Sequence, residues 1–144
     1  MLTALMARAR FGAPEKEKGM VLWNVPEELK IGAVPRRIYC NRAMVDPLAR
    51  AFGCLIDKGL IDELRTWDGC FNIRNKRSSA SPSLHSWGLA VDLNAAWNQP
   101  GRRSTLSPGF VACFVGAGFD HGGAWARPDA MHFQLSEEAF SNGS

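Results

Sequence analysis

Two histidines and two aspartates are spaced along the second half of the chain in a way that could build a metal centre. His85 and Asp92 lie seven positions apart in 83-SLHSWGLAVDLN-94, and Asp129 precedes His132 by three positions. Two imidazoles and one carboxylate are a ligand set of catalytic zinc, where water takes the fourth position. A further carboxylate beside that water can accept its proton. These residue types therefore indicate metal-assisted hydrolysis.

Each of these residues also has a structural alternative. A lone histidine is more often a hydrogen-bonded structural residue than a ligand, and Asp92 could instead cap a neighbouring helix or turn. Ser83 and Ser86 lack a nearby base of the kind that serine hydrolases need, so a nucleophilic serine is not expected.

The elements around these residues predict strands that place them on one face. In 89-LAVDLN-94 every second residue is apolar and would face a core, which leaves Asp92 on the opposite face. The same alternation in 131-MHFQL-135 leaves His132 opposite its apolar face. Two strands thus each offer a metal-competent side chain away from the core.

Two helices are expected outside these strands. Asp46 is expected to cap the first, with Pro47 in its first turn, Gly59 at its end and one apolar face, formed by Leu48, Phe52, Leu55 and Ile56. A start at Asn41 is the less favoured alternative, because it would place Pro47 inside the helix. Ser107 and Pro108 are expected to open the second helix, which runs to about residue 117.

The remaining segments complete the predicted fold class. A strand is expected at 35–41 and extended chain with an Asp68-Gly69 turn at 64–74. Residues 75–83 and 97–109 have the composition of loops. This order predicts an α+β fold with a small antiparallel sheet that carries the site and is flanked by helices.

Length and charge limit the classes of protein. The 144 residues are expected to form one domain, 1–144, in which residues 1–20 form a loosely held tail or a short helix. A net charge of +3 gives no case for a nucleic-acid partner but suits an anionic polymer such as a cell wall. The apolar run 110–119 is about half of the ~20 residues of a membrane span. Arg8 and Arg10 interrupt the apolar residues at the N-terminus, so no signal peptide is expected.

The cysteines do not form a metal-binding motif. Cys40, Cys54, Cys70 and Cys113 contain no CxxC pair, so a cysteine zinc site is not expected. They are expected to be buried thiols in a reducing cytosol, although their spacing leaves disulfides open.

Two motifs resemble the zinc D-alanyl-D-alanine peptidase family: Ser83-x-His85-x-x-Gly88-x-Ala90-x-Asp92 and Asp129-x-x-His132. That family includes bacterial D-Ala-D-Ala carboxypeptidases and dipeptidases and phage L-alanyl-D-glutamate endolysins. Its members share the fold of the hedgehog signalling domain, which is therefore the fold that the resemblance implies. The similarity covers about residues 64–135 and extends to the flanking segments 118-GF-119, 122-GGAW-125 and 131-MHFQ-134.

The resemblance implies roles for individual residues. His85, Asp92 and His132 would bind one zinc ion, and Asp129 would be the general base. The family also uses an arginine upstream of the first motif to hold a substrate carbonyl or carboxylate. Arg74 is expected to take that role, with Arg77 as the alternative.

Three further residues lie at positions near the expected site. Ser83 and Trp125 are additional candidates for substrate contact, Trp125 as a wall of the cleft. His121 stands where relatives often carry an aromatic residue, commonly tryptophan; it either contacts substrate or caps a turn, and the turn is favoured.

The resemblance finally implies a zinc metallopeptidase that cuts a bond in the peptidoglycan stem peptide. An endolysin-type L-alanyl-D-glutamate endopeptidase of a phage or prophage is expected. It would be made in the cytoplasm and act on the cell wall after release by a separate holin. A D-alanyl-D-alanine carboxypeptidase with the same site is the alternative, and a non-catalytic structural zinc module is a further one.

Overall fold

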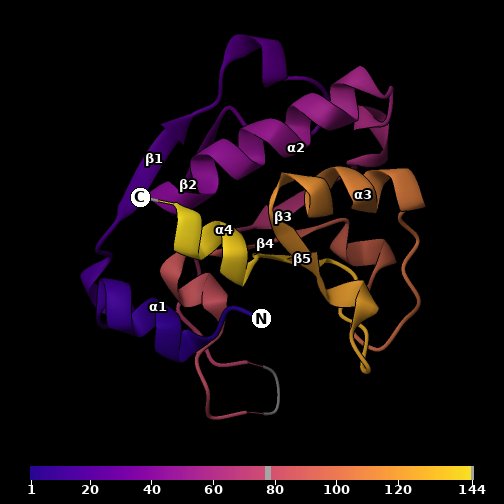
Figure 1. Cartoon of the computed structure of the whole chain (residues 1–144). Coiled ribbons are helices and arrows are strands. Elements are labelled where there is room, and N and C mark those ends of the chain that lie inside the picture. Colours follow the sequence, from indigo (N-terminus) through magenta and orange to yellow (C-terminus); the bar gives the residue numbers. More distant parts are fainter. Residues whose placement is uncertain (77–78, 144) are drawn as a thin grey trace.

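Two small antiparallel sheets and four α-helices make up the computed structural model, which describes residues 1–76 and 79–143 (Figure 1). This mixture confirms the predicted α+β class. None of the helices in these two ranges is long and apolar enough to cross a membrane.

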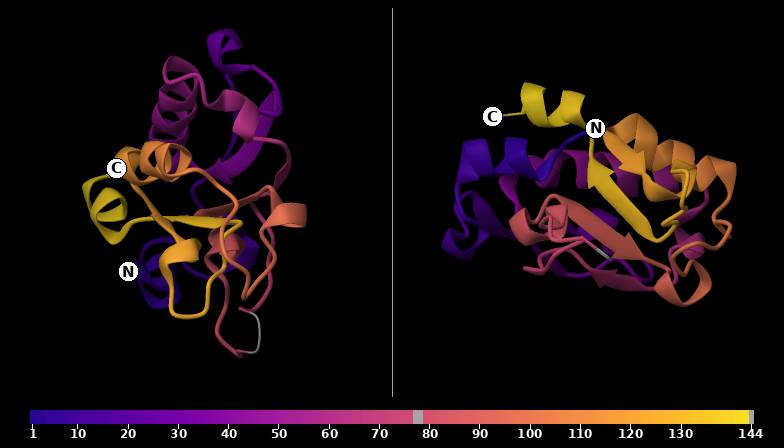
Figure 2. Two further views of the ribbon diagram at one scale, coloured as in Figure 1. Left: turned by 90° about the vertical axis from the view of Figure 1, so that its right-hand side faces the viewer. Right: turned by 90° about the horizontal axis from the view of Figure 1, so that it is seen from below.

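The larger sheet has the strand order β3-β4-β6-β5, with all neighbours antiparallel. Its strands are β3 (Trp67–Gly69), β4 (Ala90–Leu93), β5 (Phe119–His121) and β6 (His132–Leu135). The right panel of Figure 2 shows β4 and β6 side by side and running in opposite directions. Asp92 of β4 pairs directly with His132 of β6, so the two residues predicted to leave the core lie side by side.

Helices α2 (Val45–Asp57) and α3 (Pro108–Ala117) lie together above this sheet in Figure 1. Phe114 of α3 packs against Phe133 of β6 with ring centroids 4.6 Å apart, and Phe52 of α2 packs against Trp67 of β3 at 5.8 Å. Val91 is fully buried in the same core. The apolar face of the sheet therefore meets the helices, which leaves the opposite face to Asp92 and His132.

The start of α2 differs from the prediction. Asp46 makes no capping hydrogen bond; instead the Asn41 side chain accepts a hydrogen bond from the Ala43 N–H and caps a 3-10 turn, Arg42–Met44, that leads into the helix. Pro47 is the third residue of α2, where a backbone N–H has no partner within the helix, so the proline is tolerated. The prediction that Asp46 caps the helix was wrong.

The smaller sheet pairs β1 (Met20–Asn24) with β2 (Arg37–Asn41). Strand β2 was predicted and β1 was not. The Asn41 N–H donates to the Gly88 carbonyl at 3.0 Å, which joins this sheet to the loop before β4. Gly88 has φ +65, and a Cβ there would lie 2.8 Å from the Asn41 nitrogen, so the junction requires glycine.

The first 20 residues are packed against the rest of the chain. Helix α1 (Ala4–Phe11) buries Phe11 in the common core, and the Trp87 indole N–H donates to the Gly12 carbonyl at 2.9 Å. The Arg10 guanidinium donates to the Phe140 carbonyl of helix α4 (Glu137–Asn142) at 2.6 Å and lies over its ring. Of the two alternatives for this segment, the structure has the short helix.

A disulfide joins Cys54 of α2 to Cys113 of α3. The prediction of buried thiols was wrong for these two residues, because the packing of α2 on α3 brings their Cα atoms to 5.5 Å. Cys40 and Cys70 are buried thiols, as predicted, and burial raises the pKa of Cys40 to about 12.

Candidate metal centre

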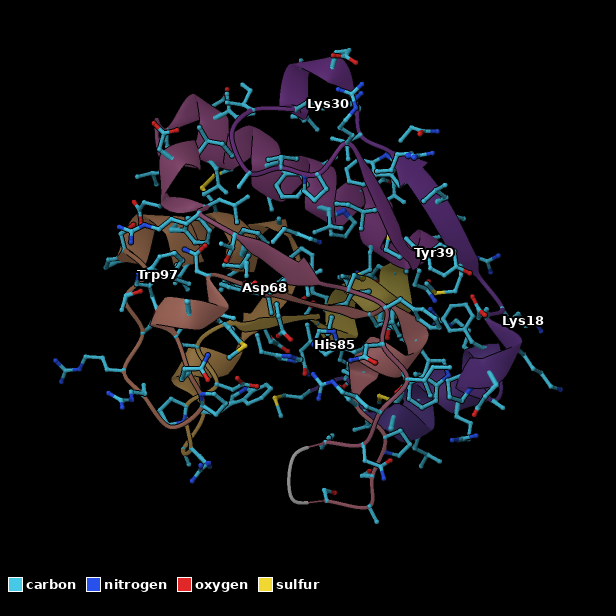
Figure 3. All side chains as sticks on the ribbon, turned by 180° about the vertical axis from the view of Figure 1, so that it is seen from behind. Lys18, Lys30, Tyr39, Asp68, His85 and Trp97 are labelled. Atoms are coloured by element: carbon cyan, nitrogen blue, oxygen red, sulfur yellow. A yellow bond between two sulfur atoms is a disulfide. The ribbon has the colours of Figure 1, made fainter. Side chains whose placement is uncertain are left out.

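The structure brings His85, Asp92 and His132 together on the face of the sheet opposite α2 and α3. His85 Nε2 lies 3.2 Å from Asp92 Oδ2, and His132 Nδ1 lies 3.5 Å from Asp92 Oδ1. One ligand atom from each residue falls within 4.8 Å of the others, so the three could hold a metal ion. Figure 3 labels His85 near the middle of the molecule.

His85 is positioned by its own loop. Ser83 accepts a hydrogen bond from the His85 N–H and caps the 3-10 turn Leu84–Trp87 that carries the histidine. The ring Nδ1 lies 2.7 Å from the Cys70 carbonyl oxygen, to which it must donate a proton. The tautomer that makes this bond leaves a lone pair on Nε2, and Nε2 is buried without a hydrogen-bond partner among the described residues.

His132 is held in the same manner by a residue that the sequence did not single out. Its Nε2 lies 3.0 Å from the Gln134 amide oxygen, which can only accept a hydrogen bond. Nε2 therefore carries the proton, and the lone pair of Nδ1 points to the side of Asp92. Such outer contacts orient metal-ligating histidines and fix their tautomers.

These contacts leave three hydrogen-bond acceptors facing one another: His85 Nε2, His132 Nδ1 and the carboxylate of Asp92. Burial by itself raises the pKa of the Asp92 carboxyl, but hydrogen bonds and charge interactions with His132 and His85, in the form in which the imidazoles carry protons toward Asp92, hold that pKa well below its usual range. In the neutral tautomers that the Cys70 carbonyl and the Gln134 amide oxygen select, no proton lies between the rings and Asp92, so two imidazole lone pairs face its carboxylate. Such a group of buried acceptors is stable only with a cation or protons between them, so the donor set fits a metal ion.

Arg74 lies at the edge of this cluster. Its guanidinium Nη2 is 3.7 Å from Asp92 Oδ2, and its side chain is 40% exposed. The Arg74 carbonyl accepts hydrogen bonds from the Ser83 N–H and from the Ser86 hydroxyl. The predicted alternative, Arg77, lies outside the described residues.

Asp129 lies in the loop that leads into β6. Its carbonyl accepts a hydrogen bond from the His132 N–H at 3.1 Å, and its N–H donates to the Gly122 carbonyl at 2.9 Å. A Cβ on Gly122 would lie 2.3 Å from the Asp129 carbonyl oxygen, so the glycine permits this close approach. The half-buried Asp129 is not one of the three clustered residues, and its predicted role as a base stays a prediction.

The other predicted residues lie in the same region. The Trp125 ring stands 5.4 Å from the His132 ring, beside the cluster. Ser83 is buried and its hydroxyl oxygen caps the His85 turn, so its predicted contact with substrate stays a prediction. His121 stacks on Phe133 at 4.3 Å and its Nε2 donates to the Ala130 carbonyl, which supports the loop before His132.

Sequence reasoning did not identify Gln134, Ser86 or Cys70 as parts of this site. Gln134 had a detectable signal, because it lies two residues after His132 and so on the same face of the predicted strand. Cys70 contributes only its carbonyl, which no side-chain pattern reveals.

A segment of the chain matches a peptidase family. Residues 76–135 match the family model described as D-alanyl-D-alanine carboxypeptidase, a segment that contains His85, Asp92, Asp129 and His132. No curated protein and no solved structure matches the chain. The match supports a peptidase of this family, in agreement with the resemblance found in the sequence.

Proposed function

We propose that the protein is a zinc-dependent peptidase that hydrolyses a peptide bond in the peptidoglycan stem peptide. One observation carries this proposal: His85 Nε2 and His132 Nδ1 both face the carboxylate of Asp92. All three residues lie inside the segment that matches the peptidase family. The substrate follows from the family, whose description names a D-alanyl-D-alanine bond.

Zinc is the metal that we propose for this donor set. Ligand atoms at 2.0–2.2 Å from a tetrahedral zinc ion lie roughly 3.3–3.6 Å from one another. His85 Nε2 lies 3.2 Å from Asp92 Oδ2 and His132 Nδ1 lies 3.5 Å from Asp92 Oδ1, and one ligand atom from each residue lies within 4.8 Å of the others. This set is slightly wider than a tetrahedral zinc site, and a bound ion would draw it together. The described residues offer three ligands at this site rather than four, which favours a catalytic over a structural site.

The residues around the cluster supply the remaining chemistry. His85, Asp92 and His132 would hold the zinc ion, which would supply Lewis-acid polarisation of the scissile carbonyl and a water of lowered pKa. Asp129 takes a proton from the attacking water and passes it to the leaving amine. The Arg74 guanidinium holds the carbonyl oxygen or a carboxylate of the substrate.

The bond that is cut has two candidates. We propose an endolysin-type L-alanyl-D-glutamate endopeptidase. The description of the matching family favours a D-alanyl-D-alanine carboxypeptidase as the second candidate. The ligands and the proposed base are the same for both, so specificity must come from residues outside the cluster.

Digestion of purified muropeptides tests both the class and the bond. Mass spectrometry of the products should reveal new termini between L-alanine and D-glutamate. Loss of terminal D-alanine would instead identify the carboxypeptidase. Chelation should abolish cleavage and added zinc should restore it; full activity in excess chelator would contradict a zinc peptidase.

A further inference from the structure

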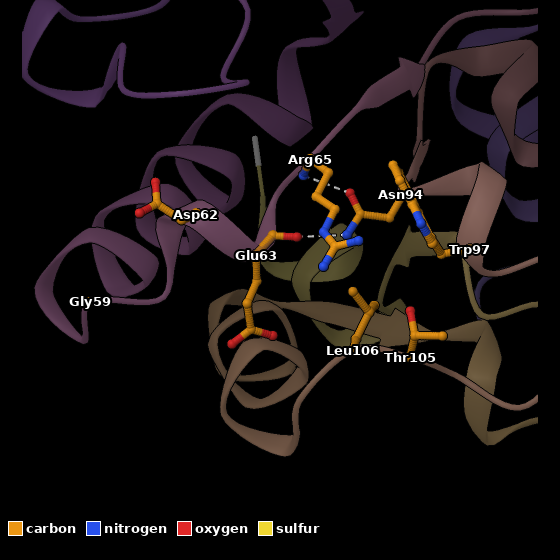
Figure 4. A pocket seen from close by; sticks show the side chains of 8 residues that line it. All are labelled: Gly59, Asp62, Glu63, Arg65, Asn94, Trp97, Thr105 and Leu106. Carbon is orange, nitrogen blue, oxygen red and sulfur yellow. Dashed lines mark hydrogen bonds between the residues drawn. The ribbon is translucent and has the colours of Figure 1, made fainter.

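A pocket of about 330 Å³ lies just beyond the end of β4, at Asn94, and none of the three clustered residues lines it. Figure 4 shows the residues that line it. It is lined on one side by Asp62, Glu63 and Arg65 and on the other by Trp97 and Thr105 of the loop that follows β4. The zinc site proposed above uses none of these residues.

The pocket is fixed rigidly to the strand that carries Asp92. Asn94, two residues further along, accepts hydrogen bonds from the N–H groups of Arg65 and Thr66. Its amide nitrogen donates to the Glu63 carbonyl at 2.7 Å. Asn94 is buried and has φ +49, a conformation that asparagine tolerates better than most residues. These bonds hold both walls of the pocket in a constant relation to Asp92.

An aromatic surface and an unpaired guanidinium face the pocket. The Trp97 side chain is 42% exposed, which is high for an indole. The Arg65 guanidinium lies 4.9 Å from the centre of its ring, and its N–H groups have no acceptor among the described residues. Figure 4 shows this guanidinium in the middle of the pocket, between Glu63 and Trp97. Five donors in a fixed plane are thus available to a ligand.

Acceptors lie beside these donors. The Glu63 carboxylate accepts hydrogen bonds from the Ser107 N–H and hydroxyl, one on each oxygen, and each oxygen can accept another. Asp62 is exposed at the rim, and the Thr105 hydroxyl can donate or accept. Two carboxylates against one guanidinium make the lining acidic, which disfavours an anionic ligand.

We infer that this pocket binds a neutral sugar unit, an N-acetylhexosamine of the wall glycan, and this inference rests on the proposed function. A sugar ring presents hydroxyl groups that use donors and acceptors alike, and its apolar C–H face can pack on the exposed indole. Leu106, which also lines the pocket, gives an apolar contact for the acetyl methyl group. The guanidinium, the carboxylates and the indole are then all used by one ligand.

If a sugar of the glycan binds in this pocket, the hydrolysed peptide bond must lie close to the sugar end of the stem peptide. Asn94 follows Asp92 by two positions, so the pocket begins roughly 7 Å along β4 from the metal cluster, at about 3.3 Å per residue. An extended peptide advances by about the same amount per residue. The stem peptide starts at the sugar with L-alanine and ends in D-alanine, so this separation favours the L-alanyl-D-glutamate bond.

Titration with an N-acetylglucosamine trimer tests the pocket without hydrolysis. The indole N–H signal of Trp97 in the ¹⁵N spectrum, assigned from Trp97→Phe, should shift saturably with the trimer. Isothermal titration calorimetry, which does not need the Trp97 signal, measures the variants: Arg65→Gln and Trp97→Ala should each weaken binding about tenfold, which is about 1.4 kcal/mol. Arg103→Gln is the matched control, because this exposed arginine lies in the same loop but does not line the pocket.

Three results would overturn the inference: no saturable shift in the wild type at millimolar trimer, binding that survives both Arg65→Gln and Trp97→Ala, or equal binding of maltotriose. If Trp97→Ala does not fold, Arg65→Gln decides. A protein that binds the trimer but cleaves no muropeptide would contradict only the proposed function. A protein that cleaves muropeptides without binding the trimer would contradict only the sugar site.

Discussion

The Ser86 hydroxyl bridges the backbone of Arg74: it accepts a hydrogen bond from the Arg74 N–H at 3.1 Å and donates to the Arg74 carbonyl at 3.0 Å. Ser86 follows His85 directly, so the arginine segment is attached to the loop that holds a candidate metal ligand. Because the Arg74 backbone is held by Ser86, its guanidinium lies in a defined position beside Asp92. The side chain is 40% exposed, so N–H donors remain free for a substrate.

We expect Arg74→Ala to lower the rate of stem-peptide cleavage by about 10- to 150-fold, equivalent to the 1.5–3 kcal/mol of a hydrogen bond to a charged group. Because Arg74 is not one of the clustered ligands, bound zinc and the melting temperature should not change. Steady-state kinetics and elemental analysis measure the two effects. Arg77→Ala is the comparison and should do much less; the opposite ranking would transfer the role to Arg77.

The Gln134 contact should contribute to metal affinity. Gln134→Leu removes the acceptor of the His132 Nε2 proton and is expected to weaken zinc binding about 10- to 100-fold, as is usual for such outer contacts. Competition with a zinc-binding dye measures the affinity. Gln134→Glu keeps an acceptor at this position and should retain most of the affinity, and Gln99→Leu on the exposed surface is the control. An unchanged affinity in Gln134→Leu would show that this contact does not orient His132.

Asp129→Asn separates catalysis from metal binding. The amide keeps the size of the side chain but cannot accept a proton, so cleavage should fall about 10²–10⁴-fold, equivalent to about 3–5 kcal/mol. Zinc content and melting temperature should stay at wild-type values. Asp120→Asn is the matched control, since Asp120 lies in β5 and not in the loop before β6. Loss of zinc from Asp129→Asn would make Asp129 a ligand instead of a base.

The disulfide should stabilise the fold independently of the metal. Cys54 and Cys113 are 59 positions apart, and closing a loop of that length contributes about 4 kcal/mol in the chain-entropy model. Reduction should therefore lower the melting temperature of the wild type, while a Cys54→Ala, Cys113→Ala variant should melt low and not respond to reductant. Thiol titration of the unfolded, unreduced chain should find Cys40 and Cys70 alone; four reactive thiols would contradict the disulfide.

The part of the site that the sequence predicted is the part encoded by local alternation. Asp92 and His132 were placed opposite the core because the residues on either side of each are apolar, and β4 and β6 formed as that alternation requires. The prediction that His85 lies beside Asp92 and His132 rested on the spacing of the two motifs and on the resemblance.

The features that were missed depend on contacts between distant segments. Strand β1 forms because it pairs with β2, and the disulfide forms because α2 packs on α3. Asn41, and not Asp46, caps the turn before α2, because β2 ends in position to deliver its side chain. The sugar pocket likewise needs Arg65 and Trp97, 32 positions apart, to meet at Asn94.

The contact between Arg10 and Phe140 spans 130 positions, and it sets an order in which the protein can fold. Helix α1 precedes α4 along the chain, so during synthesis it cannot complete its packing until α4 has been made. Until then the Phe11 ring lacks its contact with the Phe140 ring. Contacts of such separation slow folding, because the loop that joins them must close first. The candidate ligands His85 and His132 both precede α4, so we expect a metal ion bound at that stage to help order the sheet on which α1 and α4 later dock.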